Sequence, residues 1–71
     1  MEVLVFKTNI QSSEKISKVA PYLDSLNGVL QWNFDLEDID NILRVEAAGI
    51  SPRIIENTLS RAGCFCEELP D

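Results

Sequence analysis

The 71-residue sequence predicts an α+β domain whose elements follow the order β-α-β-β-α-β. Two segments carry apolar residues at helical spacing, and four short segments are rich in β-branched or aromatic residues or alternate between apolar and polar types. Turn and cap residues separate these segments. Apolar residues make up 45% of the chain, which suits a compact core. We find no repeat or linker and therefore expect residues 1–71 to form one domain.

The first half of the chain contains a strand and a helix. Residues 2–8, EVLVFKT, contain no breaker and predict the strand. Ser12 or Ser13 can cap the helix, which the pair Asn27-Gly28 should end. Pro21 should bend it, because proline removes one hydrogen bond. The apolar face of this helix comprises Ile16, Val19, Ala20, Leu23 and Leu26.

The second half adds a hairpin, a helix and a last strand. Residues 30–36 and 43–47 both alternate apolar and polar side chains, and a turn joins them. The pair Ser51-Pro52 places an N-cap before a proline at the first helical position, and Gly63 is the expected stop. Residues 64–69, CFCEEL, are short and β-prone, so they predict the final strand.

This order is the split βαβ pattern of ferredoxin-like folds. The pattern implies a ferredoxin-like βαββαβ sandwich, in which a four-stranded antiparallel sheet of order 4-1-3-2 carries both helices on one face. The residues that we expect in the core are Leu4, Phe6, Ile16, Val19, Leu23, Trp32, Phe34, Leu43, Val45, Ile55 and Leu59.

The charge and composition argue against several classes of function. A net charge of −6 disfavours nucleic-acid binding, which needs a basic surface. No apolar run approaches the roughly 18 residues that span a bilayer, and the N-terminus lacks the features of a secretory signal. We therefore expect a cytoplasmic protein with no nucleic-acid or membrane partner. The chain has no histidine, no glycine-rich phosphate loop and no nucleophile with an evident base, so we expect no enzyme activity.

Acidic residues form two clusters along the chain. The clusters are Asp35, Glu37, Asp38 and Asp40, and then Glu67, Glu68 and Asp71. Solvated turns and a solubilising tail explain them, and a docking patch for a basic partner is the alternative.

From residue 4 to residue 69 the chain resembles the heavy-metal-associated domain of copper chaperones and metal-pumping ATPases. The segments LDSLNGVLQWNFDL and IIENTLSRAGC carry this resemblance, together with the spacing between the first loop and the last glycine. The resemblance implies that Cu(I) or a similar soft ion binds to a Met-Thr-Cys-x-x-Cys motif in the first loop.

The chain is a degenerate member of this pattern, because its first loop lacks both cysteines. The corresponding stretch is KTNIQS, in which Asn9 and Ser12 replace the two cysteines and Lys7 replaces the methionine. Amide and hydroxyl oxygens are poor ligands for a soft ion. We therefore predict a metal-blind binding or dimerisation module that takes no cofactor. Ser12 would cap the helix, and Asn9 would bond its own backbone.

Two further interpretations of this region stay open. The free N–H groups of the loop, with Lys7, Lys15 and Lys18, could receive an anion or a partner carboxylate. Alternatively, the ligands of a soft ion, Cu(I) or zinc, could be displaced to Cys64 and Cys66.

The two cysteines also have other interpretations. Residues i and i+2 of a strand lie about 6.6 Å apart, which is near the limit for a disulfide, so an internal bridge is disfavoured. Cys66 could be plain core and Cys64 a partly buried thiol, or either could serve a redox or intermolecular role.

Phe65 has the opposite parity to both cysteines and should point to the open face of the sheet. There it would join Val3, Val5 and Ile42 in a candidate interaction face. Face-to-face homodimerisation is the simplest use of such a face, whereas isolated apolar residues on a small surface would need no function.

Overall fold

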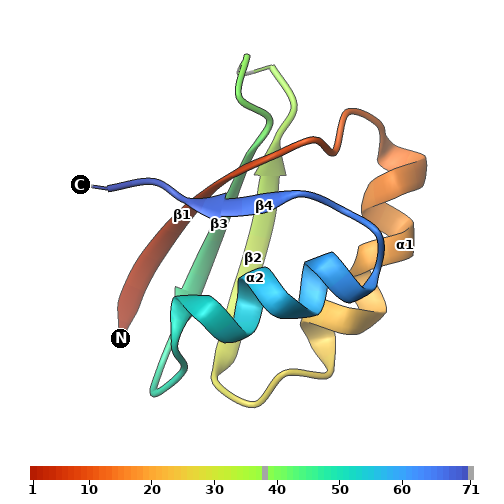
Figure 1. Ribbon diagram of the computed structural model, residues 1–71. Coiled ribbons are helices and arrows are strands. Elements are labelled where there is room, and N and C mark those ends of the chain that lie inside the picture. Colours follow the sequence, from red (N-terminus) through yellow and green to blue (C-terminus); the bar gives the residue numbers. More distant parts are fainter. Residues whose placement is uncertain (38, 71) are drawn as a thin grey trace.

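The computed structural model describes residues 1–37 and 39–70. Its elements follow the predicted order (Figure 1). They are β1 (Glu2–Thr8), α1 (Ser13–Asp24), β2 (Val29–Asp35), β3 (Ile42–Ala47), α2 (Pro52–Arg61) and β4 (Cys66–Glu68). Asp38 and Asp71, which belong to the two predicted acidic clusters, lie outside the described residues.

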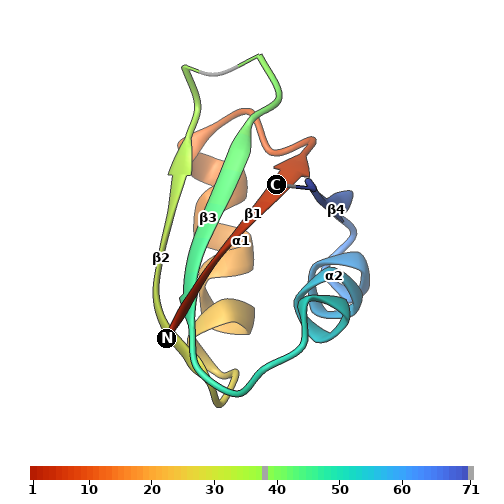
Figure 2. The same cartoon turned by 90° about the vertical axis from the view of Figure 1, so that its left-hand side faces the viewer.

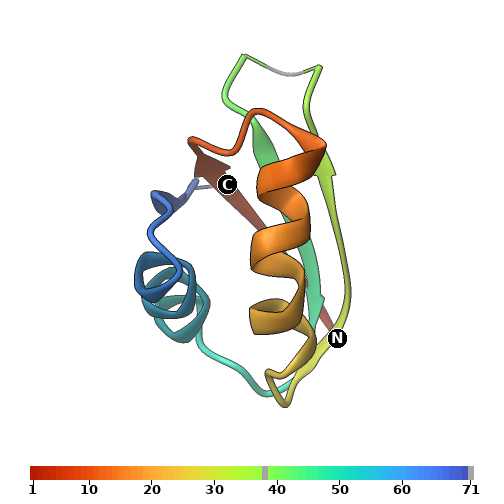
Figure 3. The ribbon, with the colours of Figure 1, turned by 90° about the vertical axis from the view of Figure 1, so that its right-hand side faces the viewer.

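The sheet has the strand order β2-β3-β1-β4, which is the predicted 4-1-3-2 order viewed from the other edge. All three neighbouring pairs are antiparallel. Both helices lie on the same face of the sheet, as Figures 2 and 3 show from opposite sides. The other face carries no helix, and among the described residues no helix is long and apolar enough to cross a bilayer.

Local signals place the two helices where the sequence predicts them. The Ser12 hydroxyl caps α1 by accepting a hydrogen bond from the Lys15 backbone N–H. The Ser51 hydroxyl caps α2 in the same way, by accepting from the Arg53 backbone N–H. Helix α1 continues through Pro21 to Asp24, and Pro21 is exposed to solvent.

The core lies between the sheet and the helices. Its fully or almost fully buried members are Leu4, Phe6, Ile10, Val19, Leu23, Leu43, Val45, Ala47, Ile55 and Leu59. Ile10 is absent from the predicted core because it lies in a loop, where no periodic pattern points to burial. Ile16, Trp32 and Phe34 are only half-buried. Trp32 and Phe34 are only half-buried because β2 is an edge strand, with a neighbouring strand on one side only.

Candidate metal site

The loop between β1 and α1 is the position at which the heavy-metal-associated pattern holds its ion. Two contacts fix this loop to the hairpin opposite it. The Thr8 backbone N–H donates to the Asp40 carbonyl at 3.2 Å, and the Thr8 hydroxyl donates to the Asn41 carbonyl at 2.6 Å. The same hydroxyl oxygen accepts from the Ile10 backbone N–H at 3.2 Å, and the Ile10 side chain is fully buried. The loop is therefore anchored to the hairpin and to the core.

Asn9 ties this loop to the segment that contains both cysteines. Its Oδ1 atom accepts a hydrogen bond from the Phe65 backbone N–H at 2.9 Å. We predicted that Asn9 would bond its own backbone, and that prediction is wrong, because the partner lies 56 residues away in the sequence. At the position where the resemblance implies the first cysteine ligand, this chain has Asn9. The Asn9 side chain joins the loop directly to the segment that contains Phe65.

Ser12 performs the capping role that the sequence predicts. Its hydroxyl oxygen accepts from the Lys15 backbone N–H at 3.3 Å. Both residues that replace the loop cysteines therefore use their oxygens to accept backbone hydrogen bonds. Neither supplies a soft ligand atom, so the residues at these two positions do not fit a Cu(I) ion. The nearby Lys7 ammonium lies 3.9 Å from a carboxylate oxygen of Asp40.

The two cysteines occupy different positions beside this loop. Cys64 precedes β4, is half-buried, and donates its backbone N–H to the Leu59 carbonyl at 2.9 Å. Cys66 begins β4, where it pairs with the buried Thr8 of β1, and it packs against the core. Both are free thiols.

The environment of Cys66 favours the protonated thiol. Burial raises the pKa of Cys66 from 9.0 to about 12, and the negative charges of Glu56 and Cys64 add to the shift. A soft ion would therefore have to displace a proton from Cys66 in order to bind there.

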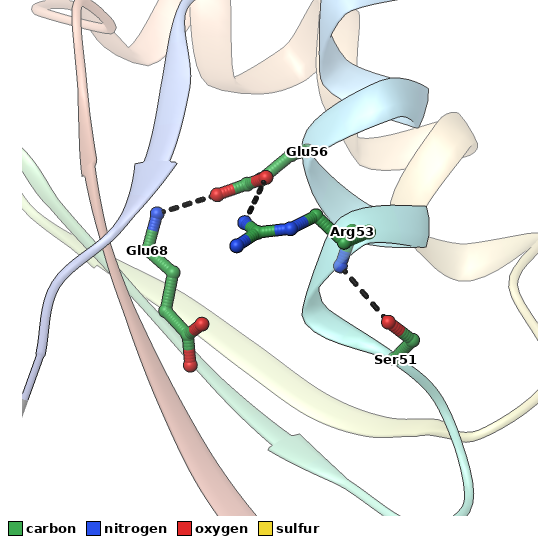
Figure 4. A network of polar contacts seen from close by, with 4 residues as sticks. All are labelled: Ser51, Arg53, Glu56 and Glu68. Atoms are coloured by element: carbon green, nitrogen blue, oxygen red, sulfur yellow. Dashed lines mark hydrogen bonds and ion pairs between the residues drawn. The ribbon is translucent and has the colours of Figure 1, made fainter.

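Glu56 connects α2 to β4 through the network drawn in Figure 4. Its Oε2 atom accepts from the Glu68 backbone N–H at 2.7 Å, and its Oε1 atom accepts from the Arg53 guanidinium at 2.7 Å. The backbone hydrogen bond from Glu68 is the main cause that lowers the pKa of Glu56, and the Arg53 interactions add to it against the cost of burial.

Sequence reasoning did not identify Glu56 as part of this site. The available signal was its position three residues after Arg53 on a helix, which is the spacing of an ion pair. That spacing does not reveal that the carboxylate also reaches β4. With Asn9 at the start of β4 and Glu56 near its end, side chains from two other elements hold this strand.

The described residues contain no group of three or more histidine, cysteine, aspartate or glutamate side chains that could hold a metal ion. They also enclose no pocket. The soft donors of the chain are the two cysteine sulfurs and one methionine sulfur, and the two cysteines stand near the loop.

The four residues of the predicted interaction face differ in their exposure. Val3 and Phe65 are 53% and 48% exposed, and Val5 is half-buried. Ile42 is only 8% exposed, so its assignment to an exposed face is wrong. On one side Ile42 pairs with Asp35 of β2. On the other side the turn that precedes Ile42 contacts β1, because the Asp40 carbonyl accepts a hydrogen bond from the Thr8 N–H.

Comparisons with known proteins identify the fold. No family model and no curated protein matches the sequence. Among solved structures, the yeast copper transporter domain Ccc2a matches with a TM-score of 0.85 at 19% identity, over 100% of this chain and 99% of that chain. The N-terminal domain of PacS from Synechocystis matches with a TM-score of 0.84 at 14% identity, over 99% and 100%. The Atx1-Cu(I)-Ccc2a complex matches with a TM-score of 0.82 at 19% identity, over 100% and 99%.

These matches confirm the resemblance to the heavy-metal-associated domain at the level of the fold. They also contradict our prediction that the chain takes no cofactor, because structures with this fold include a copper transporter domain in its Cu(I)-loaded state and a Cu(I) complex. That prediction rested on the first loop, where Asn9 and Ser12 replace the expected cysteines. Loss of ligands in one loop leaves the chain with two cysteines, which flank the residue that Asn9 binds.

Proposed function

We propose that this chain is a non-enzymatic Cu(I)-binding module in which Cys64 and Cys66 take the place of the missing loop cysteines. The observation that supports this most directly is the hydrogen bond between Asn9 Oδ1 and the Phe65 N–H at 2.9 Å. This bond holds the residue between the two cysteines against the loop. The backbone between Cys64 and Cys66 is therefore joined to the loop at which the resemblance implies a bound ion.

The chemistry of the donors favours Cu(I) over zinc. Thiolates select soft ions, and Cu(I) is stable with as few as two sulfur ligands. Structural zinc sites take four protein ligands and catalytic ones three, whereas one chain offers two cysteines and no histidine. A two-thiolate Cu(I) site is therefore the simplest site that these residues could form.

Binding of the ion at Cys66 requires that thiol to lose its proton. Cys66 holds its proton strongly, because burial raises its pKa to about 12. Ligation at Cys66 would therefore release this proton. An ion held by two thiolates alone keeps coordination positions open, so that a thiolate of a partner protein can also bind it. Transfer of Cu(I) to or from a protein partner is therefore the role that we assign to the module.

The remaining features of the chain agree with this role. The cytosol keeps cysteines reduced, which free thiol ligands require, so we place the protein in the cytoplasm. A net charge of −6 disfavours binding to nucleic acid or to an anionic membrane surface. An acidic surface instead suits a partner with a basic docking face.

A Cu(I) titration of the reduced protein tests the proposal. The wild type, Cys64→Ser and Cys66→Ser would be titrated anaerobically in competition with a chromogenic Cu(I) chelator of moderate affinity. We expect one ion per wild-type chain, loss of chelator-resistant binding in Cys64→Ser, and weaker but measurable binding in Cys66→Ser. The wild-type affinity should rise with pH, since ligation at Cys66 releases a proton.

Ser60→Cys provides a matched control, because it adds an exposed thiol on α2 to the intact pair. This variant should bind the first ion as the wild type does. If Cys64→Ser retains wild-type affinity, or if the wild type takes no ion from the chelator, the proposal is wrong.

A further inference from the structure

We infer that the open face of the sheet binds a second copy of this chain through two reciprocal Arg44–Glu46 ion pairs. This inference does not depend on the proposed metal site. It rests on the arrangement of charged and apolar side chains on the face that carries no helix, which lies on the side away from α2 in Figure 2.

The strand register places these side chains in two rows. In the first row Val3 of β1 pairs with Glu46 of β3, and in the second Val5 pairs with Arg44. Residues two apart on a strand point to the same face, so the four side chains share one face. Leu4 and Val45 lie between the rows and are buried on the helix-covered side, which assigns these four to the open side.

The four residues Val3, Val5, Arg44 and Glu46 form an arrangement that is complementary to itself under a two-fold rotation. The axis lies in the plane between two facing sheets, perpendicular to the strands, and passes midway between the two rows. Rotation about it places Arg44 of one copy opposite Glu46 of the other, and Glu46 opposite Arg44. It also places Val3 opposite Val5 in both directions. An isologous interface needs this kind of self-matching, in which residue i meets j and j meets i.

The side chains are available for such contacts. Val3 is 53% exposed and Arg44 is exposed, while Glu46 and Val5 are half-buried. Within the described part of the chain, the ion pairs are Lys7–Asp40 and Arg53–Glu56, and neither involves Arg44 or Glu46. Aligned sheets pack about 10 Å apart, a gap that extended arginine and glutamate side chains span together.

The small area of the face limits the strength of this dimer. With four strands and five paired residues in β1 and β3, the face covers roughly 300 Å² per copy. A stable interface buries about 800 Å² per partner. We therefore expect a reversible dimer that is populated at about 0.1–1 mM protein.

A charge exchange tests the geometry of this interface. Sedimentation equilibrium would compare the wild type, Arg44→Glu, Glu46→Arg and the double exchange R44E/E46R. Each single change puts like charges opposite each other twice and should weaken dimerisation about tenfold. The double exchange restores both pairs with reversed sign and should return the dissociation constant to within about threefold of the wild-type value.

Lys18→Glu on α1 supplies the control, because it makes the same change in net charge as Arg44→Glu but lies on an exposed helix position. It should leave the dissociation constant unchanged. Thermal unfolding of every variant would confirm that the fold is retained. A wild type that stays at the monomer mass of 8.0 kDa throughout this concentration range overturns the inference. So does a double exchange that is no better than the single variants.

Discussion

At the scale of single residues, Cys66 shows how the surroundings of a thiol can disfavour its ionised form. Cys66 pairs with Thr8, packs against the core and lies near the carboxylate of Glu56. Glu56 is held close by the Glu68 backbone N–H and by Arg53, so its negative charge stays near β4. Burial and this fixed charge both raise the pKa of the Cys66 thiol.

The reactivity of Cys66 should therefore depend strongly on folding. In the Cys64→Ser variant Cys66 is the sole thiol, and its rate of reaction with a thiol reagent can be measured at about pH 8. The pKa of about 12 includes a contribution from Cys64 that this variant loses, but Cys64 is the smallest of the three causes, so the rise from 9.0 lowers the thiolate fraction by up to roughly a thousandfold. We expect the native variant to react at least about a hundredfold more slowly than the same variant unfolded in urea.

Adding Glu56→Gln separates the two causes of this slow reaction. Because burial is the larger cause, loss of the carboxylate charge should speed the native reaction only severalfold. A native Cys66 that reacts within a few-fold of its unfolded rate would show that this thiol is not protected as described.

At the scale of elements, the parts that the sequence predicted well are those with local causes. The bounds of β1 match the predicted residues 2–8, and the serine caps at Ser12 and Ser51 begin the two helices. The errors concern contacts between elements distant in sequence. Neither the bond from Phe65 to Asn9 nor the burial of Ile42 follows from any local pattern, because each depends on where a neighbouring strand or loop lies.

The turn between α1 and β2 provides a test of such a long-range constraint. Gly28 has a φ angle of 101°, and a Cβ atom there would lie 2.8 Å from the Ala48 carbonyl oxygen and 2.9 Å from the Ile50 Cβ. The Ala48 N–H donates to the Gly28 carbonyl at 2.8 Å, so the two segments cannot separate without losing this bond. Gly28→Ala should lower the free energy of unfolding by about 3 kcal/mol or more, measured by urea denaturation.

Gly49→Ala is the matched control for this prediction. Gly49 also has a positive φ angle, 71°, but no atom lies within 4 Å of a Cβ built there. Gly49→Ala should lower the free energy of unfolding by about 1 kcal/mol, which is the cost of placing a residue with a Cβ atom in this left-handed backbone conformation. Equal losses in the two variants would show that close approach of the segments contributes nothing at Gly28.

At the scale of the whole molecule, the loop between β1 and α1 is held by contacts with three other parts of the fold. Thr8, Ile10 and Asn9 anchor the loop to the hairpin, the core and the start of β4. Only Asn9 and Ser12 occupy the positions at which the resemblance implies cysteines. The sequence was sufficient to identify both replacements, but it did not show that Asn9 had acquired a structural role.

These contacts predict that restoring a Cys-x-x-Cys loop lowers the stability of the apo protein and adds a site for Cu(I). The variant N9C/S12C loses the acceptor for the Phe65 N–H and the hydroxyl cap of α1. Its apo form should be less stable than the wild type by about 1–3 kcal/mol in urea denaturation. Two thiolates in the loop should bind Cu(I), and binding to the folded state alone should recover stability as the free ion concentration rises.

The variant N9A/S12A separates the stability gained from Cu(I) binding from the stability lost in the apo form, because it loses the same two oxygens and supplies no sulfur. Its apo stability should fall by a similar amount, and at matched Cu(I) activity it should recover no more than Cys64 and Cys66 provide in the wild type. A recovery in N9C/S12C that exceeds this level measures the affinity of the restored loop directly, since the stability gain grows by about 1.4 kcal/mol for each tenfold rise in free ion above the dissociation constant. If Cu(I) restores the same free energy of unfolding to both variants, residues 9 and 12 do not bind one ion together. The backbone of the loop would then differ from the one that the resemblance implies.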